Sequence, residues 1–593
     1  MTPRAARVVL PRGAVSRVAP RARVRPPSPP GPPDRWAALA FALLVLGCWS
    51  FLLVRPQSTG FGDWQYFHHM WEAGREALLR HGEWPHWDPH HCGGITIWGN
   101  PQSQIFSPSF FLSLVIGTAL ASKVHTLVHL WLAAFGAYRF ARLEARATPL
   151  AALGAGTVFG ASGFFAWHFI GGHAAFAPFA FTPWLLLAWR RSARDLRHAV
   201  AVAAWMTLTL LEGGVYPFPY FVLLLAFDLL VRLRLRNAGA LVRAGVAAAV
   251  LTALLGAVRL VPILGSLSAV PRSTELLQSR DLSSLAVSLL DVMPPPGWND
   301  AFGWPEHAGQ VGFVGLGLAA LGLLGGRRRA PWLLGALTFA TLTLGDLGPA
   351  SPWALVHRLP LYDSLRVPSR FLVFVTFYLG ILAVTAAGRR LRPRMRPWLP
   401  AALVLALALD LTLSFVPIVR FWNGPRLHGE RAPRFTLVSG AYLAEYASYP
   451  RRGVGSRQCY EPMFLPAVFG LWEGPAIQAR LLDEEGKTVD PERGRVGEVD
   501  RTSRRVVFRV DLAEPATLRV NQRHQPGWRT DVGHILPRRG LLEVRLPAGG
   551  YDVTLHYEAE GADVAAGRGA LGVLLALGLL VGTRPRRRRE AAS

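Results

Sequence analysis

Charge, lysine and cysteine are all scarce in this sequence. Only 17% of its 593 residues are charged, whereas 51% are hydrophobic, and the mean hydropathy is +0.26. This composition is too apolar for a soluble protein of such length and indicates a membrane protein. Lysine occurs only at Lys123 and Lys487, so the net charge of +26 comes from arginine. Because the arginines stand in short clusters between apolar runs, they indicate membrane topology rather than a nucleic-acid-binding face.

Recognised metal motifs are missing as well. The sequence has no H-E-x-x-H, no paired C-x-x-C, and no D-x-D in the polar stretch from Phe61 to Gln102. That stretch does hold ligand types, but their crowding around Pro89 is not a zinc spacing, and anchoring at the membrane interface is the favoured interpretation. The residues concerned are His68, His69, His81, His86, His90, His91, Asp88 and Cys92. We therefore expect no metal ligands and no cofactor, with a divalent metal as the open alternative.

Cysteine occurs at three positions only. Cys48 lies in the first apolar run, whereas Cys92 and Cys459 are both expected outside the membrane. Sequence spacing alone does not show that two distant cysteines meet, and we expect no disulfide between them.

The order of apolar runs and arginine clusters predicts the topology. Residues 1–35 are rich in Arg and Pro and are expected to form a disordered cytoplasmic tail. The run from Trp36 to Val54 is long enough for a hydrocarbon core of about 30 Å and lacks a cleavage site, so it predicts a membrane anchor. Arginine clusters follow alternate runs, as at 190–197 and 389–396. The positive-inside rule then predicts about twelve spans with both termini in the cytoplasm.

Several segments do not fit a plain series of spans. The segment 105–119 is short and has no arginine cluster after it, so a re-entrant or interfacial helix is expected there. The outer face then carries loops 55–107, 260–308 and 346–368 and a block at 420–565. This block contains RRVVFRVDL, ATLRVNQ, LLEVRLP and YDVTLHY, whose alternation predicts a β-sandwich. A final span and a basic tail at 566–593 complete a helical polytopic membrane protein with a C-terminal extracytoplasmic β-domain.

Asp63 is the first candidate for chemistry, because it follows the first span by only a few residues. A carboxylate at the outer membrane surface can act as a general base toward a lipid-linked substrate. The alternative is an N-cap for a helix from Trp64 to His81.

Other polar residues stand at predicted outer span ends. Arg370 and Arg366 in SLRVPSRF suit phosphate binding, or they are snorkelling interfacial arginines. His173 and Glu212 are candidates for contact with sugar hydroxyls, or simple helix-end residues. Asn100 and Gln102 are candidate substrate contacts, or members of a turn. The residues alone do not decide between the two interpretations in each case.

A family resemblance adds to these expectations. The stretch WPHWDPHHCGGITIWGNPQSQIFSPSFFLS, the preceding DWQYF, and LPLYDSLRVPSRFLVF resemble the YfhO-type family of polytopic membrane proteins. Two further stretches agree, GGHAAFAPFAFTPWLLLAW and VNQRHQPGWRTDVGHILPRRGLLEVRLPAGGYDVTLHY. That family is similar to GT-C class glycosyltransferases, which use polyprenyl-phosphate sugars. Asp88 departs from it, standing where relatives often carry Asn, and is expected to be a turn residue.

The resemblance implies a GT-C-like domain at 36–419 and a catalytic base at Asp63. It implies transfer of a sugar from a polyprenyl-phosphate donor to a glycan, lipid or protein acceptor of the cell envelope, at a bacterial inner membrane. Nucleic acid is not an expected partner. Two other classes remain open: a lipid or glycan transporter, and a non-catalytic assembly or polysaccharide-binding protein that works through its β-domain.

Overall fold

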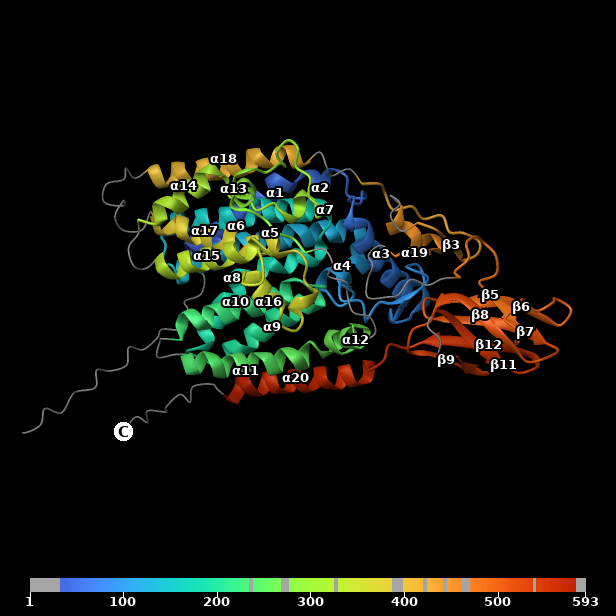
Figure 1. Ribbon diagram of the computed structural model, residues 1–593. Coiled ribbons are helices and arrows are strands. Elements are labelled where there is room, and N and C mark those ends of the chain that lie inside the picture. Colours follow the sequence, from blue (N-terminus) through green and yellow to red (C-terminus); the bar gives the residue numbers. More distant parts are fainter. Residues whose placement is uncertain are drawn as a thin grey trace, which may run out of the picture.

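The computed structural model describes residues 32–233, 238–267, 277–324, 329–386, 398–419, 424–440, 445–459, 470–536 and 540–582. The arginine clusters at 389–396 and 586–589, and most of the N-terminal tail, lie outside these ranges. The chain forms a bundle of helices that run roughly side by side, with a β-rich block at one end of the bundle (Figure 1). We call the bundle end that faces this block the β end.

Helices lie at each range where an apolar run predicts a span. They are α1 (Pro32–Trp49), α5 (Thr118–Leu143), α6 (Pro149–Gly160), α7 (Gly163–Gly171), α8 (Thr182–Ser192), α9 (His198–Leu211), α10 (Pro217–Arg232), α11 (Ala238–Leu255), α14 (Gly312–Gly322), α15 (Ala330–Thr343), α17 (Leu372–Ala386), α18 (Leu399–Val419) and α20 (Ala562–Gly582). Because α1 begins at Pro32, the last residues of the predicted tail are helical.

Five of the described helical segments are long and apolar enough to cross a membrane. They are Pro149–Gly171, Ala238–Leu255, Pro368–Thr385, Leu399–Val419 and Ala562–Gly582. The others are shorter or more polar, so a total of about twelve spans stays a prediction.

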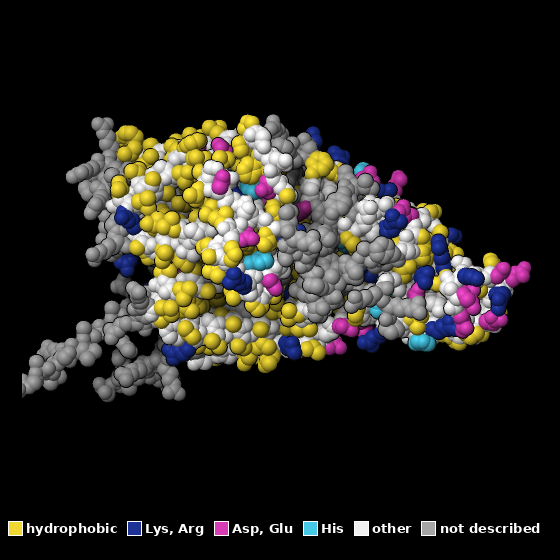
Figure 2. Space-filling view, viewed as in Figure 1, with side chains coloured by type: hydrophobic (Ala, Val, Ile, Leu, Met, Phe, Trp, Pro, Cys, Tyr) yellow, Lys and Arg dark blue, Asp and Glu magenta, His cyan; other side chains and the backbone are white. Residues whose placement is uncertain are grey.

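Apolar side chains cover the outside of the bundle, whereas charged side chains gather on the β-rich block (Figure 2). On α18, for example, Leu405, Leu409 and Leu413 follow one another at every fourth position and are all exposed. Soluble proteins rarely expose apolar patches of this extent. The bundle is therefore the membrane-embedded part of the protein.

The predicted helix at 64–81 is confirmed as α3 (Asp63–Arg75), continued by one π-helical turn, η1 (Glu76–Arg80). Its N-cap is Gly62, and no side chain caps it, so the interpretation of Asp63 as the N-cap is wrong. Helix α4 (Pro108–Ile116) has 9 residues and is about 14 Å long. It is therefore too short to cross a membrane core of about 30 Å by itself.

The β-rich block contains two four-stranded antiparallel sheets, with orders β10-β11-β8-β5 and β6-β7-β12-β9. The strands are β5 (Ala479–Leu482), β6 (Gly494–Arg501), β7 (Arg505–Leu512), β8 (Ala516–Arg523), β9 (Trp528–Thr530), β10 (His534–Ile535), β11 (Leu541–Leu546) and β12 (Gly549–Tyr557). The four alternating stretches are confirmed as β7, β8, β11 and β12. Buried side chains of both sheets share one hydrophobic cluster with Trp71 and Trp87. These two residues belong to the loop at 55–107, which we call the first loop. A sandwich stays a prediction.

A disulfide joins the first loop to the block. Cys92 and Cys459 are bonded, with their Cα atoms 4.4 Å apart, so the expectation of no disulfide is wrong. Arg523, at the end of β8, lies beside both cysteines: its Nη2 is 3.2 Å from Sγ of Cys92 and 3.8 Å from Sγ of Cys459. Local sequence could not show this, since 367 residues separate the two cysteines.

The loop histidines are mostly buried against the block, so interfacial anchoring does not describe them. Nε2 of His69 lies 3.0 Å from Oδ2 of Asp88, and Nδ1 of His90 donates to the Val454 carbonyl at 2.8 Å. Asp88 ends the two-residue strand β1 (Trp87–Asp88) and accepts from the backbone N–H of His90 at 2.8 Å, so it stands directly before the turn. Burial alone would raise the pKa of Asp88, but the neighbouring His69 more than reverses this and lowers it.

Candidate active site

Asp63 and His173 meet at the β end. Oδ2 of Asp63 lies 3.7 Å from Nε2 of His173, and the two side chains are 32% and 17% exposed. Gly172 makes this approach possible: its φ is +87°, and a Cβ there would lie 2.1 Å from the backbone nitrogen of Trp64. The Trp64 indole also donates to the Phe169 carbonyl at 2.7 Å. Helices α3 and α7 are thus in close contact at the point where Asp63 and His173 face each other.

A second histidine extends the pair inward. Nδ1 of His168 lies 2.6 Å from Nδ1 of His173, so one ring donates to the other. If His168 donates, Nε2 of a neutral His173 carries the proton and points it toward Asp63. The three side chains then form one chain of donors and acceptors that ends at a half-exposed carboxylate.

Arg370 closes the same cluster from the other side. Its guanidinium pairs with both carboxylate oxygens of Glu306, with Nε at 2.9 Å from Oε2. It also lies over the rings of Tyr216 and Phe176, 4.1 and 4.6 Å from their centroids. Burial alone would raise the pKa of Glu306, but Arg370, with His173 and His168 nearby, holds it at about 2. Glu306 is therefore ionised at neutral pH.

Arg366 stands four residues before Arg370 in the same segment. It is half-buried, and its carbonyl accepts from the backbone N–H of Gln278 at 3.1 Å. The side-chain oxygen of Gln278 in turn accepts from the backbone N–H of Ser369 at 2.9 Å. Arg366 and Arg370 therefore flank a turn that the loop at 277–281 holds in place.

Asn100 and Gln102 are only 3% and 6% exposed. Nδ2 of Asn100 donates to the Tyr66 hydroxyl at 2.8 Å, and Oδ1 accepts from the backbone N–H of Gln102 at 3.0 Å. The buried Arg259 donates to the carbonyls of Trp98 and Asn100, at 2.7 Å each. This turn is fixed from within the protein.

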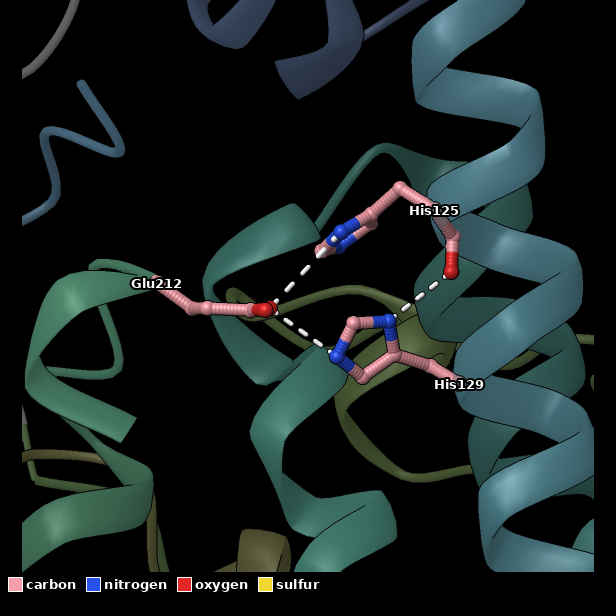
Figure 3. A group of neighbouring side chains, drawn as sticks. All are labelled: His125, His129 and Glu212. Atoms are coloured by element: carbon pink, nitrogen blue, oxygen red, sulfur yellow. Dashed lines mark hydrogen bonds and ion pairs between the residues drawn. The ribbon is translucent and has the colours of Figure 1, made fainter. Parts of the chain in front are cut away.

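Glu212 does not join Asp63 and His173. It lies beyond the end of α9 and points to His125 and His129 of α5 (Figure 3). Among the described residues, these three are the one group of His, Cys, Asp or Glu side chains arranged to hold a metal ion. The loop histidines around Asp88 form no such group within the same residues.

The described residues also line two hollows. An apolar groove of about 330 Å³ runs between helices α8 to α12 (α12 is Ala257–Leu267) and is lined by Trp189, Val202, Met206, Phe218, Val222, Leu225, Leu229, Ala248, Thr252 and Leu260, among others. Phe218 is two residues from Tyr216, whose ring contacts Arg370. A polar cleft of about 430 Å³ separates the first loop from the β-rich block, and its lining includes His90, Arg431, Phe435, Gln478 and Arg501.

Sequence reasoning missed His168 and Glu306. His168 lies inside an apolar run, and Glu306 is one of several acids in the loop at 260–308. No local pattern marks either residue. Glu306 of η3 (Trp304–Glu306) meets Arg370 of η6 (Pro368–Phe371) only in the folded chain, whereas His168 of α7 contacts His173 five residues further on.

No protein-family model matches this chain, and no curated protein matches it either. Among solved structures it is similar to the arabinofuranosyltransferase AftD from Mycobacteria, with 16% identity and a TM-score of 0.45, over 65% of this chain and 27% of that one. It is also similar to the oligosaccharyltransferase AglB from Archaeoglobus fulgidus, solved in complex with an inhibitory peptide and a dolichol-phosphate. There the identity is 14% and the TM-score 0.37, over 66% of this chain and 56% of that one. The chain thus spans less than two thirds of either protein, and we take no residue role from them.

Proposed function

We propose that this chain is a membrane glycosyltransferase. It moves a sugar from a polyprenyl-phosphate donor to a glycan, lipid or protein acceptor at the membrane face where the β-rich block lies. The observation that carries the proposal is the half-exposed Asp63 carboxylate, held beside His173 at the end of an apolar bundle. A lipid-linked sugar would present its head group at this depth.

Asp63 is the general base in this reaction. It accepts the proton of an acceptor hydroxyl while that oxygen forms a bond to the anomeric carbon. The bond between the anomeric carbon and the phosphate oxygen breaks, and the lipid phosphate leaves with the electron pair. His173 is a positioning residue, since its Nε2 faces Asp63 and its Nδ1 is held by His168.

The leaving phosphate is bound by arginine. Glu306 occupies Nε and Nη2 of Arg370, which leaves Nη1 as the edge directed to a phosphate oxygen, with Arg366 as the second cation. The prenyl chain lies in the apolar groove, whose lining includes Phe218 in the first turn of α10, the helix for which Tyr216 is the N-cap. His173 and Glu306 lie next to the bound head group. Asn100 and Gln102 do not contact it but support the first loop through internal hydrogen bonds.

The disulfide supports the orientation. Disulfides persist in oxidising compartments and are rare in the cytosol. The bond between Cys92 and Cys459 therefore favours a β end outside the cytoplasm. Both termini are then cytoplasmic, and the acceptor belongs to the cell envelope.

The test is sugar transfer from a panel of radiolabelled polyprenyl-phosphate sugars, using membranes with equal amounts of wild type, Asp63→Asn or Asp363→Asn. Asp363 is exposed in the loop at 346–368 and serves as the matched control. We expect transfer by the wild type and the control, and its loss in Asp63→Asn. Equal transfer by Asp63→Asn would overturn the role of Asp63, and no transfer from any donor would overturn the enzymatic function.

One observation favours a second candidate, glycan binding without turnover. The polar cleft of about 430 Å³ lies between the first loop and the β-rich block, and Arg501 in it stacks on Phe435 with 4.8 Å between the guanidinium carbon and the ring centroid. Aromatic and polar linings of this kind suit sugar faces and hydroxyls. Binding of an oligosaccharide that Asp63→Asn leaves unchanged, with no transfer by the wild type, would select this function.

A further inference from the structure

The cluster in Figure 3 joins two helices below the first loop. His125 and His129 are four residues apart on α5 and therefore share one face of the helix. Glu212 faces them from the end of α9, and the three residues are 2%, 3% and 3% exposed. One ligand atom from each residue lies within 4.8 Å of the others. Three ionisable side chains in so apolar a place need a compensating partner.

Hydrogen bonding leaves two of these atoms unsatisfied. Nδ1 of His129 lies 2.8 Å from the His125 carbonyl, which only accepts, so Nδ1 carries a proton. Nε2 of a neutral His129 then offers a lone pair, and it faces Oε2 of Glu212 at 2.9 Å. Both atoms are buried, and neither makes a hydrogen bond of acceptable geometry. Two facing acceptors repel each other, so the pair requires a positive charge, either a second proton on Nε2 of His129 or a metal ion that the second histidine also reaches.

The first loop supplies a contrast. His69 also has one ring nitrogen toward a carbonyl and the other toward a carboxylate, but there Nε2 makes a hydrogen bond of 3.0 Å with Asp88. No third ligand joins that pair within the described residues. The arrangement at His129 differs in both respects, since a second histidine converges on the same carboxylate (Figure 3).

We propose that His125, His129 and Glu212 bind a divalent transition-metal ion of the zinc type. Two imidazoles and one carboxylate are a ligand set that Zn²⁺ takes with a fourth position left open, whereas Mg²⁺ and Ca²⁺ prefer oxygen ligands. Zn–N and Zn–O bonds of about 2.0–2.2 Å require ligand atoms about 3.4 Å apart. Small side-chain rotations bring the three atoms to that spacing. The site differs from the expectation of no metal ligands and goes beyond the proposed glycosyl transfer.

Neighbouring groups hold the ligands in place. The Ser109 hydroxyl lies 2.8 Å from Nδ1 of His125 and orients this ring, with the backbone of Ala174 near it. Nε2 of Gln104 donates to the backbone carbonyl of Glu212 at 2.9 Å, and the Trp71 indole donates to Oε1 of Gln104 at 3.0 Å. The ion therefore ties α5 and α9 to the loop that carries Asp63.

The test measures metal binding, so it does not depend on any sugar transfer. The full chain, purified in nanodiscs, is stripped with a chelator and titrated with Zn²⁺ or Co²⁺, with elemental analysis after desalting. We expect about one ion per chain and the visible absorption of tetrahedral Co²⁺. Glu212→Gln and His129→Asn should lose at least about 100-fold in affinity, because removal of supporting contacts alone costs 10- to 100-fold.

Two further variants keep the result interpretable. His307→Asn removes a buried histidine that pairs with Asp300 at 3.0 Å and is not part of the cluster, and this variant should bind the ion like the wild type. His125→Cys retains a ligand and should retain the ion while adding thiolate-to-Co²⁺ absorption. Equal binding by wild type and Glu212→Gln, or no binding by the wild type, would overturn the site. The latter result would leave a protonated His129 as the partner of Glu212.

Discussion

Two imidazole–carboxylate clusters at the β end are built from the same kinds of side chain but differ in their exposure to solvent. The Asp63 side chain is 32% exposed beside His173, whereas the Glu212 side chain is 3% exposed beside His129. An exposed carboxylate can exchange a proton with a bound hydroxyl. A buried one must keep a fixed positive partner, because an unpaired charge in an apolar interior is costly. The partly exposed Asp63 is therefore suited to catalysis, and the buried Glu212 to structural support.

The difference arises from where each carboxylate stands on its helix. Asp63 is the first residue of α3, beyond the bundle, where the helix dipole favours a negative charge. Glu212 follows the last turn of α9 and is covered by the first loop through Gln104. The first loop therefore leaves the Asp63 carboxylate partly exposed and covers the Glu212 carboxylate.

The largest effect is expected at the exposed cluster. Asp63→Asn should lower sugar transfer by about 10² to 10⁴-fold, because it removes the proton acceptor. The free energy of unfolding should fall by no more than about 1 kcal/mol, the size of a charge interaction with a helix N-terminus. Transfer assays and melting curves on one preparation check both parts. A large loss of stability would mean that Asp63 is a structural residue like Glu212.

The sealed cluster should show the reverse pattern. Glu212→Gln leaves two buried histidines without their carboxylate, and it should destabilise the fold by about 3–5 kcal/mol. Differential scanning fluorimetry in nanodiscs, with and without Zn²⁺, measures the change. Zn²⁺ should raise the melting temperature of the wild type only. An unchanged melting temperature in Glu212→Gln would show that Glu212 has no structural role.

The disulfide sharpens the comparison, because it fixes the loop that both clusters share. Cys92→Ser should destabilise the junction of loop and block by about 2–5 kcal/mol. Reductant should have the same effect on the wild type and none on the variant. Cys48→Ser is the control, since Cys48 is unpaired. A loop whose protease resistance is the same in Cys92→Ser would show that packing alone holds it.

The smallest effect is expected on mild acidification. Burial lowers the pKa of His90 to about 4 and that of His91 to about 3, from 6.5. The unfolded loop therefore binds more protons in this range, so the stability is fully present above pH 6.5 and is lost as pH falls toward 4. The loss should be about 1–2 kcal/mol at pH 6. Hydrogen exchange of residues 84–100 at pH 7.5 and pH 6 measures it, and His90→Gln should reduce the dependence.

Periodic features of the fold could be predicted from the sequence, and pairings between distant segments could not. Apolar runs marked the helices, and the alternation in RRVVFRVDL marked β7, since each depends on neighbours along the chain. Asp63 and His173 were found because each stands at the end of a run. Glu306 and the partner of Cys92 were missed, because their roles depend on contacts between segments far apart in sequence. His168 was missed although His173 is only five residues away, because it lies inside an apolar run.

The bond between Cys92 and Cys459 also has a consequence for biosynthesis. It closes a covalent ring across a sequence separation of 367, so the first loop reaches the membrane surface long before its partner is made. At about 5–20 residues per second, the loop waits roughly 20–70 seconds. During this interval Cys92 is a free thiol and the first loop lacks the surface that buries Trp87. A nascent chain of this protein is therefore a substrate for thiol oxidases and chaperones until nearly all of its helices are inserted.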